Sequence, residues 1–532
     1  MTLVLPLMPV LVPLTTAIAL FFVRKSIPAQ RAIALIGTVT LGFVAAILAI
    51  AVHREGAPLA VQAGGWAAPF GITMVADQLA VILVVLTAVV ALGVLIYAMG
   101  SLDERRESMG FHPLYQTLIT AVCGAFLTGD IFNMYVWFEV MLLSSFVLIT
   151  LGGERAQLDG AIKYVTLNLL SSSFFLTAIG LLYGTAGTLN FADLHLRLSE
   201  IAGSPEQREQ SEHFLSTLSM LFLAGFGIKA ALWPFFFWLP ASYHTPPPVI
   251  AAVFAGLLTK VGVYSIIRTF TMVFDQEPMF VGGVILALAT ISMLSGVLGA
   301  ASQYDFRRIL AFHSVSQVGY MLMGFAIGWM AWDNGQKEIG TLALAGTIYF
   351  IFHHGIVKMN LFLVSGLVLK LKGTTNLKKL GGLFEEDAPL ATVFFVTAMA
   401  LAGIPILSGF WAKLALVRAG LETGHYLVIG VSLFVSVLTL FSMTKIWAEA
   451  FWKELPEDVE RPEPATKATP GQLGLMFAPV ASYALLAVLL GVCVGPLFDL
   501  CMQAAEGVFE NTAYIEAVNP AIEGYDPEEL LP

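Results

Sequence analysis

Charge is scarce in this chain of 532 residues. Lys, Arg, Asp and Glu make up 12% of it, whereas ordinary soluble domains contain about 25%. The 27 Lys and Arg residues are outnumbered by 37 Asp and Glu residues, so the formal net charge is −10 and no basic excess is left to bind nucleic-acid phosphates. These figures exclude a soluble globular enzyme, a disordered chain and a nucleic-acid-binding protein.

Cysteine is nearly absent as well. The three cysteines, Cys123, Cys493 and Cys501, match no metal-binding spacing, and each lies in an apolar stretch. No dinucleotide-binding motif follows a strand pattern. We therefore expect the cysteines to be small buried side chains without a redox role. We also expect the chain to carry neither a metal nor a cofactor.

Apolar residues, in contrast, make up 58% of the chain. A helix that crosses the hydrocarbon core of a bilayer needs about 20 of them in succession. The sequence predicts an all-α polytopic membrane protein with about 14 transmembrane helices. The predicted spans cover residues 4–23, 31–52, 78–100, 112–129, 131–151, 161–183, 214–238, 248–270, 279–301, 308–330, 341–368, 388–417, 425–451 and 473–497.

The distribution of basic residues predicts how these spans are oriented. Arg24, Lys25 and Arg31 follow the first span, and most other loop Lys and Arg residues also follow odd-numbered spans. Cytoplasmic loops carry the excess of Lys and Arg, so both chain termini are predicted to lie outside. The polar stretch 185–213 is expected to be an exterior loop with a short helix. The acidic tail 506–532 is expected to be a solvated end, with a docking strap as the alternative.

Several ionisable residues fall inside the predicted spans, where a charge costs at least about 2.5–3.5 kcal/mol on insertion scales. A substrate or proton path explains why ionisable residues lie inside the spans, whereas a purely structural membrane protein does not need them there. Lys163 and Lys445 lie near span ends, so they have the alternative of snorkelling to the interface. The set consists of Glu139, Lys163, Lys229, Lys260, His313, His353, His354, Lys358, Lys413 and Lys445.

Two spans are interrupted by proline, the seventh at Pro234 and the twelfth at Pro405. At membrane depth a broken helix lines a cavity, and transporters place such breaks at matching positions of two repeats. Each broken span carries a lysine, and a second lysine follows on the next span. The spacings are 31 residues (229 to 260) and 32 residues (413 to 445).

These spacings predict two five-helix repeats, spans 4–8 and 9–13, which are inverted because five is odd. The chain then divides into an N-terminal three-helix segment (1–111), a first half-channel (112–270), an inverted second half-channel (279–452), and a last helix with the acidic tail (473–532).

His354 and Lys358 are four residues apart and share one face of the eleventh span, whereas His353 points about 100° away. No Asp, Glu or Cys lies nearby at metal-ligand spacing. His313 with His353 or His354 is a formal haem-ligand pair that an absorption spectrum would test. Residues 171–173 (all serine) and Thr259 are expected to bond either waters of the path or only helix carbonyls.

Two long motifs surround these lysines: FGIKAALWPFFFWLPASY at 226–243 and PPPVIAAVFAGLLTKVGVY at 246–264. Both resemble the antiporter-like subunits shared by respiratory complex I and the multisubunit Mrp cation/proton antiporters. The resemblance extends from the first span to the last. The segment IPILSGFWAK at 404–413 is typical of the MrpD branch.

The resemblance implies which residues form a proton pathway in a bacterial plasma membrane. In the family pattern, a glutamate on span 5 faces a lysine on span 7, and further lysines and histidines follow on spans 8, 10, 11 and 12. We expect Glu139 and Lys229 to form a buried ion pair. Additional candidates for the proton pathway are Ser172, Thr259, Lys163 and Lys445. The matching residues here are Glu139, Lys229, Lys260, His313, His354 and Lys413, and Lys358 shares the face of His354.

The resemblance also implies that the chain is a subunit of a secondary antiporter rather than an enzyme. The antiporter would exchange protons for Na⁺ or another monovalent cation. Its expected partners are MrpA-, MrpB-, MrpC-, MrpE-, MrpF- and MrpG-like subunits, together with lipid. The alternative is a proton-pumping subunit of complex I or of a membrane-bound hydrogenase. Both uses need the same channel, so the chain alone does not separate them.

Overall fold

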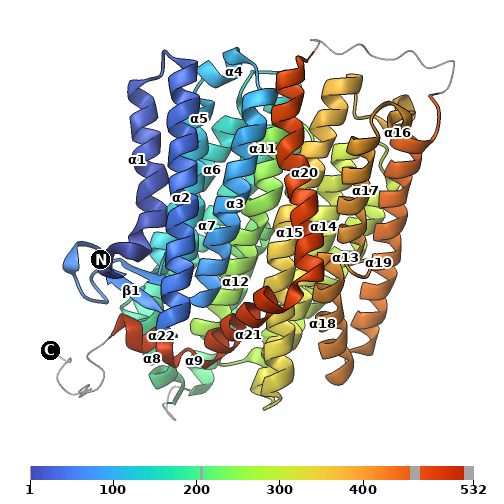
Figure 1. Ribbon diagram of the computed structural model, residues 1–532. Coiled ribbons are helices and arrows are strands. Elements are labelled where there is room, and N and C mark those ends of the chain that lie inside the picture. Colours follow the sequence, from blue (N-terminus) through green and yellow to red (C-terminus); the bar gives the residue numbers. More distant parts are fainter. Residues whose placement is uncertain (1, 204–207, 456–467, 520–532) are drawn as a thin grey trace.

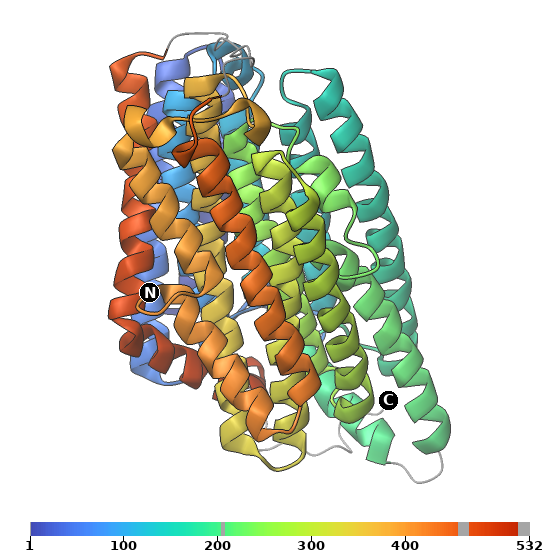
Figure 2. The same ribbon diagram turned by 90° about the vertical axis from the view of Figure 1, so that its right-hand side faces the viewer.

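The computed structural model describes residues 2–203, 208–455 and 468–519, and these form a bundle of long, roughly parallel helices (Figures 1 and 2). The predicted helical membrane fold is confirmed. The transmembrane part consists of α1 (Met8–Phe22, preceded by the 3₁₀ turn Thr2–Leu7), α2 (Ile27–Glu55), α3 (Gln78–Ser101), α5 (Phe111–Leu127), α6 (Ile131–Thr150), α7 (Arg155–Ala186), α9 (Arg208–Ala230), α11 (Pro248–Val253), α12 (Thr259–Met272), α13 (Pro278–Ser302), α14 (Phe306–Asp333), α15 (Lys337–Lys372), α17 (Ala388–Ala402), α18 (Ser408–Glu422), α19 (Tyr426–Ile446) and α20 (Pro470–Val492).

Shorter elements connect or flank these helices. They are α4 (Glu104–Ser108), α8 (Phe191–Gly203), α10 (Trp238–Ser242), α16 (Leu383–Glu386), α21 (Val494–Glu510), α22 (Thr512–Val518), two further 3₁₀ turns (Ala63–Gly65 and Leu377–Lys379), and the π-helical segments η3 (Phe254–Leu258) and η5 (Trp447–Trp452). The short helix expected within 185–213 is α8.

Among the described residues, twelve helices are long and apolar enough to cross a membrane. Two shorter apolar helices, α5 and α17, lie where the fourth and twelfth spans were predicted. The count of fourteen therefore stays a prediction. Cys123 and Cys501 are buried as expected, but Cys493 is exposed, so the expectation was wrong for that residue.

A small antiparallel hairpin joins α2 to α3, and the sequence analysis did not predict it. Strands β1 (Leu59–Gln62) and β2 (Thr73–Ala76) pair with Leu59 opposite Ala76 and Gln62 opposite Thr73. The Thr73 hydroxyl donates to Gln62 Oε1 at 2.7 Å. Four-residue strands in a predominantly helical chain give too short a pattern to predict from sequence.

The packing order supports two repeats. In the first, α5 packs on α6, α6 on α7, α7 on α9, and α9 on α12; in the second, α13, α14, α15, the α17–α18 pair and α19 follow the same order. The two interrupted spans also share a backbone feature, because each break contains a non-glycine residue in the left-handed region, Ala231 (φ 61°) and Ile406 (φ 75°). Such residues are rare, so the two breaks correspond structurally.

The segment that follows α20 is a packed strap in its described part. Helix α21 crosses the end of the bundle obliquely and contacts α15, α3 and α12, and α22 reaches α8 and the hairpin (Figure 1). Asn511 Nδ2 donates to Thr271 O at 2.7 Å, and Phe509 stacks on Trp332. The expected solvated end was therefore wrong for residues 506–518. Residues 520–532 of the predicted tail lie outside the described part of the chain.

At the opposite end of the bundle, α4 carries a buried carboxylate. Glu107 accepts hydrogen bonds from Arg31 Nε and Nη2 at 2.9 and 2.6 Å, and it pairs with His112 Nε2 at 3.1 Å. Burial alone would raise the pKa of Glu107, but the hydrogen bonds from His112 and Arg31 outweigh burial and lower the pKa. This group ties α2, α4 and α5 together.

We expect Glu107→Gln to lower the thermal stability of the purified protein. The free energy of unfolding should fall by about 1.5–3 kcal/mol, which is the usual contribution of a hydrogen bond to a charged group. A lowered folded-state pKa adds stability that is present above the unfolded pKa and lost as the pH falls through the folded pKa. The difference between wild type and variant should therefore be complete at pH 7 and shrink only below the ordinary glutamate pKa of about 4.5. Thermal unfolding followed by tryptophan fluorescence measures it, with exposed Glu104→Gln as the control. Equal midpoints at pH 7 would contradict the prediction.

Candidate functional site

The first half of the bundle holds Glu139 and Lys229 without a direct contact. Ser172 on α7 donates a hydrogen bond to Glu139 Oε1. Lys229 Nζ donates to Asn168 O at 3.4 Å and lies 5.6 Å from the centroid of the Phe138 ring. Among the described residues, no ion pair within 4 Å joins Glu139 to Lys229, so the predicted direct pair was wrong. Lys229 and Ser172 both donate to Asn168 O, so a chain of hydrogen bonds connects the two groups, and their charges still interact electrostatically.

The exposure of these two side chains differs. Lys229 is 3% exposed, whereas Glu139 is partly exposed in the isolated chain. Ser171, next to Ser172, donates to Gly225 O on α9 at 2.6 Å, and Ser173 donates to Leu169 O at 3.0 Å. Of the three serines, only Ser172 thus reaches a titratable group of the predicted pathway.

The break of the seventh span begins directly after Lys229. Helix α9 ends at Ala230, and the chain turns back so that Leu232 N donates to Gly227 O at 2.8 Å. The predicted break residue Pro234 lies in this turn, and Trp238 Nε1 donates to Ile228 O at 2.9 Å. Lys229 is therefore a cation in the last turn of a helix, where the helix dipole favours positive charge.

Lys260 lies just after the π-helical segment η3 and is fully buried. Its ammonium group donates to Ala255 O within that segment. A π-segment inside an α-helix is often found at a functional site. Gly256 of η3 packs against α15 at Gly355 O, where a Cβ atom would meet that oxygen at 3.5 Å. The lysine is thereby brought next to the histidines of α15.

The centre of the chain contains buried polar groups whose atoms lack partners. The ring nitrogens of His313 and His354 and the Nζ of Lys358 have no hydrogen-bond partner among the described residues, and all three side chains are fully buried. The same holds for both amide atoms of Gln317 and the hydroxyl of Thr259. Buried polar groups are normally hydrogen-bonded, and buried water supplies the bond where protein does not.

These groups are close enough to interact electrostatically. His354 interacts with Lys260, Lys358 and His313. His313 in turn interacts with Lys358, Lys413 and Lys445. Lysines and histidines from α12, α14, α15, α18 and α19 are thus electrostatically connected, and we call five of them the central cluster (Lys260, His313, His354, Lys358 and Lys413).

Lys413 lies at the break of the twelfth span, across from the end of α17. Its ammonium group donates to Ala402 O at 2.9 Å, Leu401 O at 3.4 Å and Ser436 Oγ at 3.2 Å. The first two are terminal carbonyls of α17, which ends where the chain turns through Gly403 (φ 88°). The break continues through Pro405 to α18, which begins at Ser408. Lys413 follows its break, whereas Lys229 precedes its own.

The structure adds two residues that the sequence analysis left out of the pathway. His353 Nδ1 lies 2.7 Å from Ser408 Oγ and interacts electrostatically with Lys413, so it connects α15 to the twelfth-span break. Gln317 is one turn after His313 on α14. An interval of four residues from His313 is the only sequence signal for Gln317, and no sequence pattern pairs His353 with Ser408.

The two lysines with a snorkelling alternative have local partners. Lys163 has a 51% exposed side chain and pairs with Asp159 at 2.6 Å. Lys445 donates to Ala301 O and Gln303 O, both at 2.7 Å, at the carboxyl end of α13. These contacts give Lys445 a structural role at the end of α13, whereas Lys163 forms an exposed ion pair within α7, and the part of both residues in a pathway stays a prediction.

Comparison with known proteins agrees with this architecture. Residues 128–439 match the family model described as "NADH:quinone oxidoreductase/Mrp antiporter, TM". The chain is 41% identical to the D-type subunit of the Na⁺/H⁺ antiporter of Alkalihalophilus pseudofirmus, over 97% of this chain and 99% of that protein. It is 36% identical to the corresponding D-type Na⁺/H⁺ antiporter subunit of Bacillus subtilis, over 96% and 98% of the two chains.

Solved structures show the same fold. A chain of the Mrp complex from Dietzia sp. DQ12-45-1b matches with a TM-score of 0.86 at 30% identity, covering 97% of this chain and 99% of that one. A chain of respiratory complex I from Thermus thermophilus matches with a TM-score of 0.77 at 20% identity, covering 96% and 99%. The chain therefore belongs to the transmembrane subunit family shared by NADH:quinone oxidoreductase and Mrp antiporters, and within it to the branch of D-type antiporter subunits.

Proposed function

We propose that this chain is the proton-translocating subunit of a multisubunit Na⁺/H⁺ antiporter, and that protons move along Glu139, Lys229, the central cluster and His353. The observation that carries the proposal is the central cluster itself. Its members are buried and titratable, and the partnerless atoms of His313, His354 and Lys358 need water to complete their hydrogen bonds. Ionisable residues inside a membrane mark ion and proton paths.

Charge repulsion within the cluster provides the transfer step. Two neighbouring ammonium groups in a low-dielectric environment destabilise each other. When a proton arrives at Lys260, the added charge weakens the hold of Lys358 on its own proton, since these two groups interact electrostatically. The released proton passes through water to His354 or His313, and then toward Lys413. Neutral imidazole accepts at one nitrogen and donates from the other, which suits it to this relay.

Glu139 and Lys413 are the two ends of the proposed path. Glu139 holds Lys229 in its charged form through space, and the hydrogen bond from Ser172 fixes the carboxylate. Protonation or displacement of Glu139 would leave Lys229 buried without a counter-charge and favour release of its proton. At the other end, the carbonyls of α17 and the Ser436 hydroxyl surround the Lys413 ammonium group, so a proton leaves from a polar pocket.

The assembly and orientation are part of the same proposal. The loops after odd-numbered spans share one end of the bundle, where α4 and α16 lie, and α8, α21 and α22 lie at the other end (Figure 1). With most basic loops at the first end, that end is cytoplasmic and both termini are outside. The partners are other Mrp-type membrane subunits. Purification of the assembled complex distinguishes this proposal from a redox-driven complex, which would bring flavin or iron–sulfur subunits.

We expect Glu139→Ala to abolish Na⁺-dependent proton movement in inverted vesicles while the complex still assembles, because Lys229 loses its counter-charge. Ser172→Ala should reduce the rate only in part, since the carboxylate stays but loses a hydrogen bond. Quenching of a pH-sensitive dye after Na⁺ addition measures transport, and immunoblotting measures assembly. Exposed Glu422→Ala is the matched control. Wild-type rates in Glu139→Ala at every pH tested would refute the assignment.

A further inference from the structure

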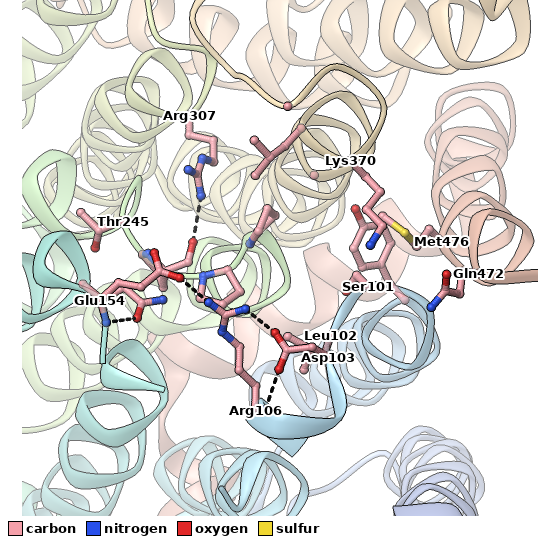
Figure 3. A pocket seen from close by; sticks show the side chains of 18 residues that line it. Ser101, Leu102, Asp103, Arg106, Glu154, Thr245, Arg307, Lys370, Gln472 and Met476 are labelled. Atoms are coloured by element: carbon pink, nitrogen blue, oxygen red, sulfur yellow. Dashed lines mark hydrogen bonds and ion pairs between the residues drawn. The ribbon is translucent and has the colours of Figure 1, made fainter. Parts of the chain in front are cut away.

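A cleft of about 650 Å³ opens at the end of the bundle where α4 lies, and none of the groups in the proposed pathway lines it. Figure 3 shows its polar lining, which comes from separate elements: Asp103 and Arg106 at α4, Glu154 before α7, Arg307 on α14 and Lys370 on α15. Tyr97, Leu369, Met476 and residues 246–248, all proline, provide apolar wall. The cleft is thus lined by both charged and apolar side chains.

The charges of the cleft do not cancel. Arg106 forms ion pairs with both Asp103 and Glu154, so the two carboxylates of the lining share one guanidinium group (Figure 3). Arg307 and Lys370 remain without a carboxylate within 4 Å among the described residues. Lys370 also has no hydrogen bond there, although Lys372, two residues later, pairs with Glu386. Arg106, Arg307 and Lys370 thus face two carboxylates, so the lining of the cleft carries an excess of one positive charge.

Donor groups in the cleft are also unsatisfied. Arg307 Nη1 donates to Pro246 O at 2.8 Å, but its Nε is buried without a partner among the described residues. Arg106 Nε is also buried without a hydrogen-bond partner among the described residues. A buried donor without an acceptor is costly, and a guanidinium group is suited to binding an oxyanion through two parallel hydrogen bonds.

We propose that this cleft binds one phosphate-bearing anion between Arg307 and Lys370. Arginine supplies a planar fork of donors and lysine a mobile point charge, a combination suited to a phosphate group. Basic pockets between transmembrane helices at the cytoplasmic side bind anionic lipid head groups. The phosphate comes either from such a lipid, whose glycerol and first methylenes lie on Tyr97, Leu369 and Met476, or from free inorganic phosphate. None of the residues that line this site belongs to the proposed proton path.

The test uses the full-length chain in its purified complex, with the double variant Arg307→Gln/Lys370→Gln. Exposed Lys379→Gln is the control, because it removes a positive charge at the same end of the bundle outside the cleft. One arm measures co-purified phosphatidylglycerol and cardiolipin by native mass spectrometry after delipidation in a neutral detergent. The other arm measures the rise in unfolding temperature when inorganic phosphate is titrated into delipidated complex, with chloride at matched ionic strength.

We expect wild type and Lys379→Gln to retain one anionic lipid or to be stabilised by phosphate, and the double variant to lose at least about tenfold in affinity. Retained lipid identifies the head group as the ligand, whereas a phosphate shift without retained lipid identifies the free ion. The charge-conserving pair Arg307→Lys/Lys370→Arg should keep binding, which separates lost recognition from misfolding. No bound lipid and no phosphate shift in wild type, or equal binding in the double variant, overturns the proposal.

Discussion

Replacing Lys413 by glutamine should abolish antiport in vesicles that contain the assembled complex, lowering the rate by at least about tenfold. Glutamine can still donate hydrogen bonds to Leu401 O and Ala402 O, so the turn between α17 and α18 should survive. It cannot take up and release a proton, so the relay ends there. A surface lysine would tolerate this change, since exposed charges contribute little, but Lys413 is only 8% exposed.

The glutamate variant makes the same test sharper. Lys413→Glu keeps a titratable group but places a carboxylate against two backbone carbonyls, an arrangement that favours the protonated acid. We expect a remnant of transport whose pH profile is displaced from that of wild type. Exposed Arg418→Gln, later on α18, is the matched control and should leave transport unchanged. Normal exchange in Lys413→Gln at wild-type expression would exclude the relay role.

Lys260→Arg should be as inactive as Lys260→Ala, although it keeps the positive charge. Arginine stays protonated in proteins, so a station that must give up its proton is blocked by it. The site is fully buried and its ammonium group donates to the π-segment carbonyl of Ala255. We expect a loss of at least about tenfold in Na⁺-dependent proton movement for both variants.

Lys445 provides the contrast to Lys260. It is partly exposed and its ammonium group caps the carbonyls of Ala301 and Gln303, a role that arginine can fill. Lys445→Arg should therefore transport normally while Lys260→Arg does not. Immunoblots and unfolding temperatures of the purified complexes show whether the larger side chain at position 260 disturbs folding. Recovery of wild-type transport in a well-folded Lys260→Arg complex would make Lys260 a fixed charge and route the path around it.

The sequence predicted the parts of this fold that arise from local composition. Long apolar runs indicated the helices, prolines marked both interrupted spans, and ionisable residues within apolar runs marked the site. Each of these signals is contained in a short window of sequence. The lysine spacing led to the prediction of the repeat, although Lys229 precedes the break of its span and Lys413 follows the break of its own.

The features that the sequence did not predict depend on contacts between distant segments. Glu139 and Lys229 were expected to form a direct ion pair, but Ser172 and the Asn168 carbonyl of α7 are the groups that they contact. His353 on α15 and Ser408 on α18 lie within hydrogen-bonding distance of each other. No periodic pattern in the sequence relates these two positions. Residues 506–518 of the strap were expected to be solvated because their acidic residues were visible in the sequence, while the contacts of α21 and α22 with other helices were not.

Helix α15 runs without interruption from Lys337 to Lys372, whereas the seventh and twelfth spans are broken. Lys358 of the central cluster and Lys370 of the anion cleft lie twelve residues apart on it (370 − 358), or about 18 Å at 1.5 Å per residue. The helix therefore acts as one stiff rod between the two places. An axial slide or tilt of this rod displaces both lysines at once. If cleft occupancy and protonation of the cluster each favour one position of the helix, then protonation changes the anion affinity of the cleft by the same factor as occupancy changes the proton affinity of the cluster, because such coupling is reciprocal.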